Sequence, residues 1–376
     1  MRNGALCLTA ILAFGGMLLA PTPGSAQYPV LAKFDHNQTT TLEGIVTWVD
    51  WRTPNVHVMV LVEDENGDTV RWAVATDSAF TLARSGWNRE TLVPGDPVRV
   101  EGMPARDGSP QVWGNEIVNT ATGLRVLYAE PREPFRPIEA RPTPRWDNGQ
   151  PILAIRPGGP DGYWALPTKT YLVEDGVEVD MVDGSGILRD LSDVSRVAPL
   201  QPWAEALYAY RQSRYLQDDP MRLNCKPPGG PRQFQLPYGI QFVEDHDRER
   251  IFVLIGSGNR NHRIIYNDGR PFTGAVGGDD DNPLYYGRAR GEWDGDTLVV
   301  ESRGFNEDFW FSNGGLPHTS HLRLVERFTR VDHDTLEYEV TIDDPGAYTR
   351  PWTVSWQLHW VSGEDLPFFL CQDNRP

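Results

Sequence analysis

The chain is poor in cysteine and in positive charge, and it lacks the short motifs of several common enzyme classes. Its 376 residues include 3 cysteines, and 35 lysines and arginines stand against 52 aspartates and glutamates, a formal net charge of −17. This balance disfavours nucleic acid and anionic membranes as partners, because phosphate binding needs a concentrated positive face. The sequence has no G-x-S-x-G, H-E-x-x-H, P-loop or C-x-x-C motif. We therefore predict no metal site and no cofactor, and an enzyme site would have to be assembled from scattered residues.

Apolar runs long enough to span a membrane are also missing after the first residues. Residues 5–20 form an apolar stretch behind the positive charge of Arg2, and Gly24-Ser25-Ala26 then provides the small residues of a cleavage site. A membrane anchor is the alternative, but the stretch is short and prolines follow it. We predict a signal peptide over residues 1–26 and a periplasmic or secreted protein without a membrane span.

Removal of this segment would leave two of the three cysteines, Cys225 and Cys371. An even pair in an oxidising compartment predicts one disulfide between them, with two buried free thiols as the alternative. Such a bond would tie the end of the chain to the start of its second domain.

Residues 38–126 are predicted to form one small domain. Strands are expected at 41–50, 55–63 and 69–75, a short helix at 79–84, and two further strands at 98–103 and 111–118. Three strands, a helix and two strands follow the element order of an OB-fold, a five-stranded barrel that often binds oligonucleotides. The acidic charge of the chain argues against that use.

Residues 127–198 are predicted to be an extended strap, because prolines are dense between residues 128 and 168 and remove amide donors. Residues 199–376 are predicted to form a helix followed by antiparallel β-structure. The helix is expected within 199–219, with Trp203, Ala206, Leu207 and Tyr210 on one face. We expect this face to pack on the core, and a ligand-binding face is the alternative. Several of the predicted strands are separated by tight turns, and they span 240–244, 251–255, 263–266, 288–293, 297–302, 322–330, 335–342, 353–360 and 368–371. The predicted fold is mainly β, with an OB-like barrel and a larger antiparallel barrel or sandwich of lipocalin-like outline.

Several motifs resemble a group of uncharacterised secreted bacterial proteins, in which an OB-like domain of unknown function precedes a β-rich domain of unknown function. In the second domain the resemblance includes Cys225-Lys226-Pro227, the run from Gly291 to Val300, Gly304-Phe305-Asn306, Pro317-His318 and Thr341-Ile342-Asp343-Asp344-Pro345. Arg288 stands where the group tends to carry a histidine. The resemblance implies the architecture and a secreted location, and it brings no established activity.

The candidate catalytic residues are His318, Glu326 and Asp343. A neutral imidazole at His318 beside Glu326 could act as a general base, or could bind a metal with help from the carboxylate. Asp343 and Asp344 are adjacent carboxylates on a strand, so at most one of them can line a pocket. The structural alternatives are a loop histidine bonded to backbone and a turn aspartate ahead of Pro345.

The candidate ligand-binding residues are of two kinds. Aromatic side chains are expected to line a cavity inside the second domain, namely Trp293, Trp310, Tyr348 and Trp352. Arginines around two predicted hairpins would bind an anionic group if they converge, because the guanidinium fork fits carboxylates; these are Arg263, Arg270, Arg288 and Arg290. Ion pairs with surface carboxylates are the structural alternative.

Three functions follow from these residues. The first is a binding protein for a small organic molecule or a glycan, held in the second domain. The second is a cofactor-independent hydrolase, lyase or isomerase that uses His318 and Glu326. The third is an assembly module of the cell envelope, in which the OB-like domain docks a protein. The sequence leaves the oligomeric state open.

Overall fold

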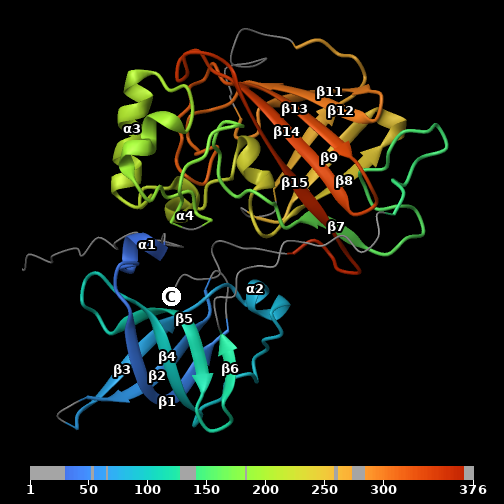
Figure 1. The fold of residues 1–376 in the computed structure, drawn as a ribbon. Coiled ribbons are helices and arrows are strands. Elements are labelled where there is room, and N and C mark those ends of the chain that lie inside the picture. Colours follow the sequence, from blue (N-terminus) through green and yellow to red (C-terminus); the bar gives the residue numbers. More distant parts are fainter. Residues whose placement is uncertain are drawn as a thin grey trace, which may run out of the picture.

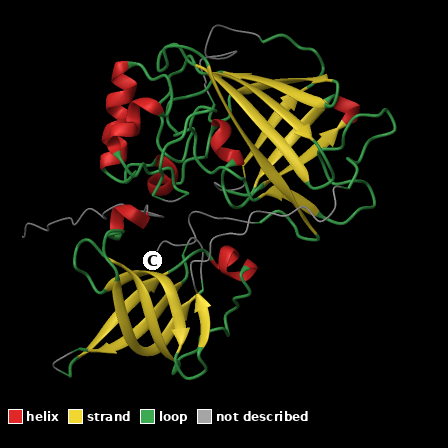
Figure 2. Cartoon of the chain, viewed as in Figure 1, coloured by secondary structure: helices red, strands yellow, loops and turns green. Residues whose placement is uncertain are grey.

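The computed structural model describes residues 30–51, 55–64, 67–127, 141–182, 184–257, 261–272 and 284–367. The chain folds mainly as β-structure in two barrels, the smaller formed by the N-terminal part and the larger by the C-terminal part (Figures 1 and 2). The predicted fold class is confirmed. The predicted signal peptide lies outside the described residues.

The smaller barrel has five strands and the topology of an OB-fold. Strand β1 pairs with both β2 and β4, and β3 closes the barrel by pairing in parallel with β5. The strands are β1 (Thr40–Asp50), β2 (His57–Glu63), β3 (Thr69–Ala75), β4 (Pro97–Pro104) and β5 (Gln111–Asn119), and β6 (Leu124–Leu127) pairs with the end of β5. Helix α2 (Ala79–Arg84) connects β3 to β4, and its N-cap Ser78 accepts a hydrogen bond from the Thr81 amide.

The larger barrel has nine strands in the order β10-β11-β12-β13-β14-β15-β7-β8-β9. Eight of them follow the predicted segments: β8 (Ile240–Asp245), β9 (Arg250–Ile255), β10 (Asn261–Tyr266), β11 (Arg288–Asp294), β12 (Thr297–Arg303), β13 (Arg323–Arg330), β14 (Thr335–Asp343) and β15 (Trp352–Ser362). Every pairing is antiparallel except that of β10 with β11, which is parallel. The long connection between these two strands allows such a crossover. The last predicted strand, 368–371, lies outside the described residues.

The ninth strand, β7 (Gly162–Ala165), comes from the segment predicted to be a strap. It pairs with β15 on one side and with β8 on the other. The stretch between Pro160 and Pro167 contains no proline, so its amide donors are free to join the ladder. The sequence prediction missed this central strand because prolines are dense on both sides of its four residues.

The main helix, α3 (Pro202–Ser213), lies within the predicted range, but it buries a different face. Ala204, Tyr208 and Gln212 are buried, whereas Trp203 and Tyr210 are about half exposed. The polar Gln212 can be buried because its amide bonds the backbone at Leu188, Gly186 and Gly314. The other described helices are short, namely α1 (Val30–Lys33), α4 (Pro220–Asn224) and the 3-10 helices η1 (Leu191–Arg196), η2 (Gly230–Phe234) and η3 (His246–Arg248). No helix in the described ranges is long and apolar enough to span a membrane.

The interior of the larger barrel is filled by the protein itself. Helix η2 places Phe234 against Phe328 and Tyr338, at ring-centre distances of 5.3 and 4.6 Å. The indole of Trp356 donates a hydrogen bond to the Phe234 carbonyl at 3.2 Å. These side chains belong to one buried core that spans the barrel. The aromatic residues therefore pack against one another rather than around an open interior.

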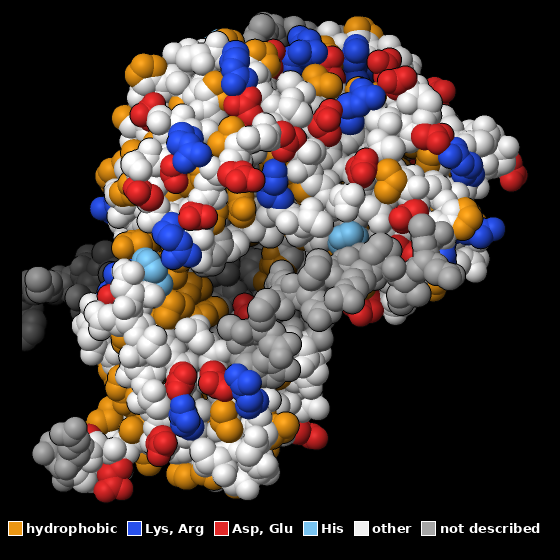
Figure 3. Space-filling model, viewed as in Figure 1, with side chains coloured by type: hydrophobic (Ala, Val, Ile, Leu, Met, Phe, Trp, Pro, Cys, Tyr) orange, Lys and Arg blue, Asp and Glu red, His pale blue; other side chains and the backbone are white. Residues whose placement is uncertain are grey.

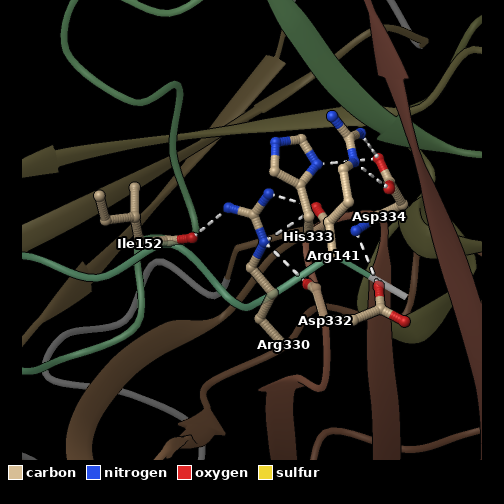
Figure 4. Close-up of polar contacts among 6 residues, drawn as sticks. All are labelled: Arg141, Ile152, Arg330, Asp332, His333 and Asp334. Atoms are coloured by element: carbon tan, nitrogen blue, oxygen red, sulfur yellow. Dashed lines mark hydrogen bonds and ion pairs between the residues drawn. The ribbon is translucent and has the colours of Figure 1, made fainter. Parts of the chain in front are cut away.

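Arg330 holds one end of this barrel together. Its buried guanidinium lies between the rings of Trp164 and Trp360, at 4.8 and 5.5 Å from their centres. It donates hydrogen bonds to the carbonyls of Ile152, Asp332 and His333 (Figure 4). One side chain thus fastens residue 152, which precedes β7, to the β13–β14 turn.

Replacing Arg330 by methionine is expected to lower the free energy of unfolding by about 1–3 kcal/mol, because carbonyls buried under the guanidinium lose their donors. Urea denaturation of the two proteins measures this loss. Replacing Arg141 by methionine is the control, since Arg141 is exposed and its pair with Asp334 is worth little. An equal effect of the two substitutions would contradict the role given to Arg330.

Candidate functional site: an arginine-lined pocket beside β10 and β11

The candidate site is a pocket at the junction of β10 and β11. These strands pair only through Ile265 with Ala289 and Tyr266 with Arg290, so the first part of β10 is not paired with β11. A cavity of about 460 Å³ lies there. Its described lining combines arginines with aromatic rings, and includes Arg263, Arg270, Arg288, Arg290, His262, Tyr266, Phe272, Tyr285 and Tyr286.

The charge of this pocket is opposite to that of the chain. Four arginines line it, and no aspartate or glutamate does so among the described residues. The sequence predicted that Arg263, Arg270 and Arg288 bind a ligand, and the structure brings all three to one cavity together with Arg290. Two of these cations have a counter-ion just outside the lining, Glu326 for Arg263 and Asp268 for Arg270, so the excess of positive charge that attracts an anion is smaller than the number of arginines.

Arg263 forms the buried wall of the pocket and is 3% exposed. Its Nη1 donates to Glu326 Oε1 at 2.9 Å, and its Nη2 donates to Ser302 Oγ at 2.7 Å and to the second Glu326 oxygen. The Tyr338 hydroxyl donates to Glu326 Oε1 at 2.9 Å. Burial opposes the charged form of Arg263, but the charge and hydrogen bonds of Glu326 outweigh it and raise the pKa of Arg263. The Arg263 guanidinium is therefore charged at neutral pH.

One donor of Arg263 remains unused. Its Nε is buried and has no hydrogen-bond partner in the described part of the chain. An unsatisfied buried donor costs about 1–3 kcal/mol, more when it is charged. The Arg263 side chain is turned into the barrel towards Glu326 and Ser302, so this donor belongs to the barrel interior behind the pocket wall.

Aromatic rings hold two other arginines in place. The Arg270 guanidinium lies 3.9 Å from the centre of the Tyr266 ring, and that of Arg290 lies 4.5 Å from the centre of Phe272. Arg290 Nη1 also donates to the Arg270 carbonyl at 3.1 Å, and Asp268 bonds the Arg270 side chain. Cation–π contacts and hydrogen bonds restrict these long side chains before a ligand arrives, which lowers the entropy lost on binding.

The predicted catalytic pair is not brought together. His318 is buried, its Nε2 bonds the Asn306 carbonyl at 2.9 Å, and its ring packs on Phe309 at 4.4 Å. Burial lowers the pKa of His318, so the ring is neutral near pH 7. Glu326 lies inside the barrel, bonded to Arg263, Ser302 and Tyr338. The geometry of His318 is that of the structural alternative, a histidine fixed to backbone.

Of the two adjacent aspartates, Asp344 is the buried one. It accepts hydrogen bonds from the Thr319 amide and hydroxyl and from the Gly346 amide. Asp343 is partly exposed and lies 3.8 Å from Arg323. Neither lines the arginine pocket, and Asp344 has the bonding of a turn aspartate.

The predicted aromatic ligand residues lie apart from the pocket. Tyr348 and Trp352 are buried and pack on each other at 5.3 Å. Trp310 belongs to a separate small cluster with Leu31, and Trp293 packs partly buried against the large core. None of the four lines the arginine pocket. The rings that do line it were missed because they flank the arginines without a repeating pattern.

Cys225 ends helix α4 with a left-handed backbone conformation, at φ 56°. Its predicted partner, Cys371, lies outside the described residues, and the disulfide stays a prediction.

Comparison with known proteins gives one match. The model of a family of unknown function, DUF6152, matches residues 17–113, which include β1 to β4 of the smaller barrel. No curated protein and no solved structure matches the chain. The chain therefore carries an N-terminal domain similar to a family whose function is not known.

Proposed function

We propose that this protein binds a small organic anion in the arginine pocket and does so outside the cytoplasm, as its predicted signal peptide suggests. The observation that carries the proposal is the convergence of four arginines on one cavity without a lining carboxylate among the described residues. A volume of about 460 Å³ lies within the usual range of small-molecule sites.

The lining also indicates the chemistry of the ligand. Guanidinium groups fit carboxylate, phosphate or sulfonate oxygens, and Arg270, Arg288 and Arg290 supply such groups to the lining. The rings of Phe272, Tyr285 and Tyr286 offer flat apolar surface for the rest of the molecule. A flat anion such as an aromatic carboxylate or phosphate uses both features, whereas a neutral sugar has no charge for the guanidinium groups to bind.

We expect the mature protein to bind phenyl phosphate, and the Arg290→Gln variant to bind it about 10- to 100-fold more weakly, because a charge-assisted hydrogen bond contributes about 1.5–3 kcal/mol. Isothermal titration calorimetry measures both affinities. Raising the salt concentration should weaken binding further, since the attraction is partly Coulombic.

Arg327→Gln is the matched control, because Arg327 lies on β13 outside this pocket and pairs with Asp294. It should leave the affinity unchanged. Equal binding of phenyl phosphate and neutral benzyl alcohol, or an equal loss in the Arg327→Gln variant, would contradict the proposal.

A further inference from the structure

A second cavity lies between the two barrels. Figure 3 shows a hollow there with hydrophobic side chains at its edge, and the cleft measures about 430 Å³. Helix α1 and the α2 region line one side, and the larger domain lines the other. Most of the surface that lines the cleft is apolar, and the apolar residues of the described lining are Val30, Leu31, Leu166, Pro167, Ile187, Leu216, Leu236 and Pro237.

The two parts of the chain make specific contacts around this cleft. Leu31 packs in one cluster with Ile187, Leu216 and Trp310, and Met103 of β4 packs against the same cluster. The Arg106 guanidinium lies 4.3 Å from the centre of the Tyr215 ring. The cleft is therefore bounded by packed side chains of both barrels.

Gln235 is the unusual residue of this cleft. It is 1% exposed, and neither its side-chain oxygen nor its side-chain nitrogen has a hydrogen-bond partner. Among the described residues that line the cleft, no other has a buried polar side-chain atom without a partner. Buried amides are normally satisfied, so an amide with both groups unpaired calls for an explanation.

The neighbouring polar groups are already occupied. Asn313 Oδ1 accepts from Arg232 Nε at 2.9 Å, and Asn313 Nδ2 donates to the Thr170 carbonyl at 2.6 Å. Arg222 Nε lies 3.2 Å from Asp219 Oδ2. These bonds hold Asn313 and Arg222 in place, whereas the Gln235 amide is the buried polar group of the described lining that has no partner.

We propose that this cleft is a second ligand site, in which Gln235 binds the amide group of a neutral, largely apolar molecule. A carboxamide presents one donor and one acceptor in a plane, which match the acceptor and donor of another amide. The cleft is lined by one carboxylate, Asp77, and one guanidinium, Arg222, so its described charges balance and do not select an ion. This site is independent of the arginine pocket.

The test uses the mature chain and N-acetyl-leucine amide, a neutral probe with two amides and a branched apolar side chain. The ¹⁵N resonance of the Gln235 side chain, assigned by its loss in Gln235→Leu, should shift and saturate as the probe is added. Calorimetry should show at least a tenfold loss of affinity in Gln235→Leu. The melting temperature of the unliganded variant should rise, because the unpaired amide is gone.

Gln233→Leu is the matched control. Gln233 lies in η2 two residues away, is equally buried and does not line the cleft. It should keep the wild-type affinity for the probe. Gln235→Met, which keeps the length of the side chain and has no amide, serves if Gln235→Leu does not fold, and the same loss is expected. An unshifted Gln235 resonance, an unchanged affinity in the variant, or a crystal structure with water alone on the amide at saturating probe overturns the proposal.

Discussion

Replacing Glu326 by alanine is expected to lower the free energy of unfolding by about 3–5 kcal/mol, the usual effect of removing one partner of a buried ion pair. Glu326 is 0% exposed and receives bonds from Arg263, Ser302 and Tyr338. Without the carboxylate, the Arg263 charge would stay inside the barrel with no counter-ion. Urea denaturation at pH 7 measures the change.

Two further variants separate the charge from the packing. Tyr338→Phe removes one hydrogen bond to Glu326 and should lower the free energy of unfolding by about 1 kcal/mol. The loss is small because the Glu326 carboxylate keeps its other hydrogen bonds. The double variant Arg263→Met with Glu326→Leu should recover much of the loss, since buried ion pairs can often be replaced by apolar residues. A loss below 1 kcal/mol in Glu326→Ala would show that water or another group already solvates Arg263.

This pair also bears on the proposed ligand. Glu326 bonds two nitrogens of Arg263 and so fixes this side chain behind the pocket wall. Glu326 is thus a positioning residue. Glu326→Gln keeps the shape, and we infer that it weakens phenyl phosphate binding less than Arg290→Gln does, since Glu326 would not contact the ligand.

Much of the fold could be predicted because burial on one face of a strand leaves a period of two in the sequence. In β14, Leu336, Tyr338, Val340 and Ile342 are all fully buried on one face. The same signal found eight strands of the larger barrel and the element order of the smaller one. Alternation does not indicate which strands pair with each other, so the parallel pairing of β10 with β11 could not be predicted.

The filled interior could not be predicted for a related reason. Phe234 enters the barrel from η2, which spans five residues and has no period to detect. The buried face of α3 was missed because Gln212 is polar and becomes a core residue only through bonds to three distant backbone groups. Tertiary contacts therefore determine both the position of Phe234 inside the barrel and the buried face of α3.

For the candidate site, the sequence indicated which charged residues to consider but not which residues lie close together. Arginines around β10 and β11 stand out in an acidic chain, and the structure gathers them. His318 and Glu326 are close in sequence, but Glu326 faces inward on β13 and bonds a residue 63 positions earlier. Strand alternation and barrel closure, rather than sequence distance, select its partner.

Asp219→Asn is the second substitution expected to have a large effect, again about 3–5 kcal/mol at pH 7. Asp219 is 0% exposed and accepts from Arg232 Nη1 at 2.9 Å and from the Met221 amide at 3.0 Å. Asparagine keeps the shape of the side chain but leaves the Arg232 charge buried without its counter-ion. The neighbouring Asp218→Asn is the control, because its exposed pair with Arg214 contributes only about 0.3–0.5 kcal/mol.

This pair also predicts sensitivity to acid. Burial acts to raise the pKa of Asp219, but the charge and hydrogen bonds of Arg232 outweigh it and hold the pKa below its usual value. A carboxyl whose pKa is lowered by folding stabilises the protein above its unfolded pKa of about 3.9, and this contribution is lost as the pH falls through the folded pKa. The difference between wild type and Asp219→Asn should therefore be constant from pH 7 down to about pH 5 and shrink below about pH 4. Urea midpoints measured across this range test it, and a difference that persists undiminished at the lowest pH would assign the effect to packing.

The same network links stability to the cleft between the barrels. Asp219 holds Arg232, and Arg232 Nε holds Asn313 at the polar side of the cleft. Arg222, which lines the cleft, contacts Asp219 directly. Loss of the Asp219 charge should therefore weaken binding of N-acetyl-leucine amide even under conditions where the variant is folded, whereas Asp218→Asn should not. If a folded Asp219→Asn variant binds the probe with unchanged affinity, the Asp219–Arg232 ion pair does not determine the shape of the cleft.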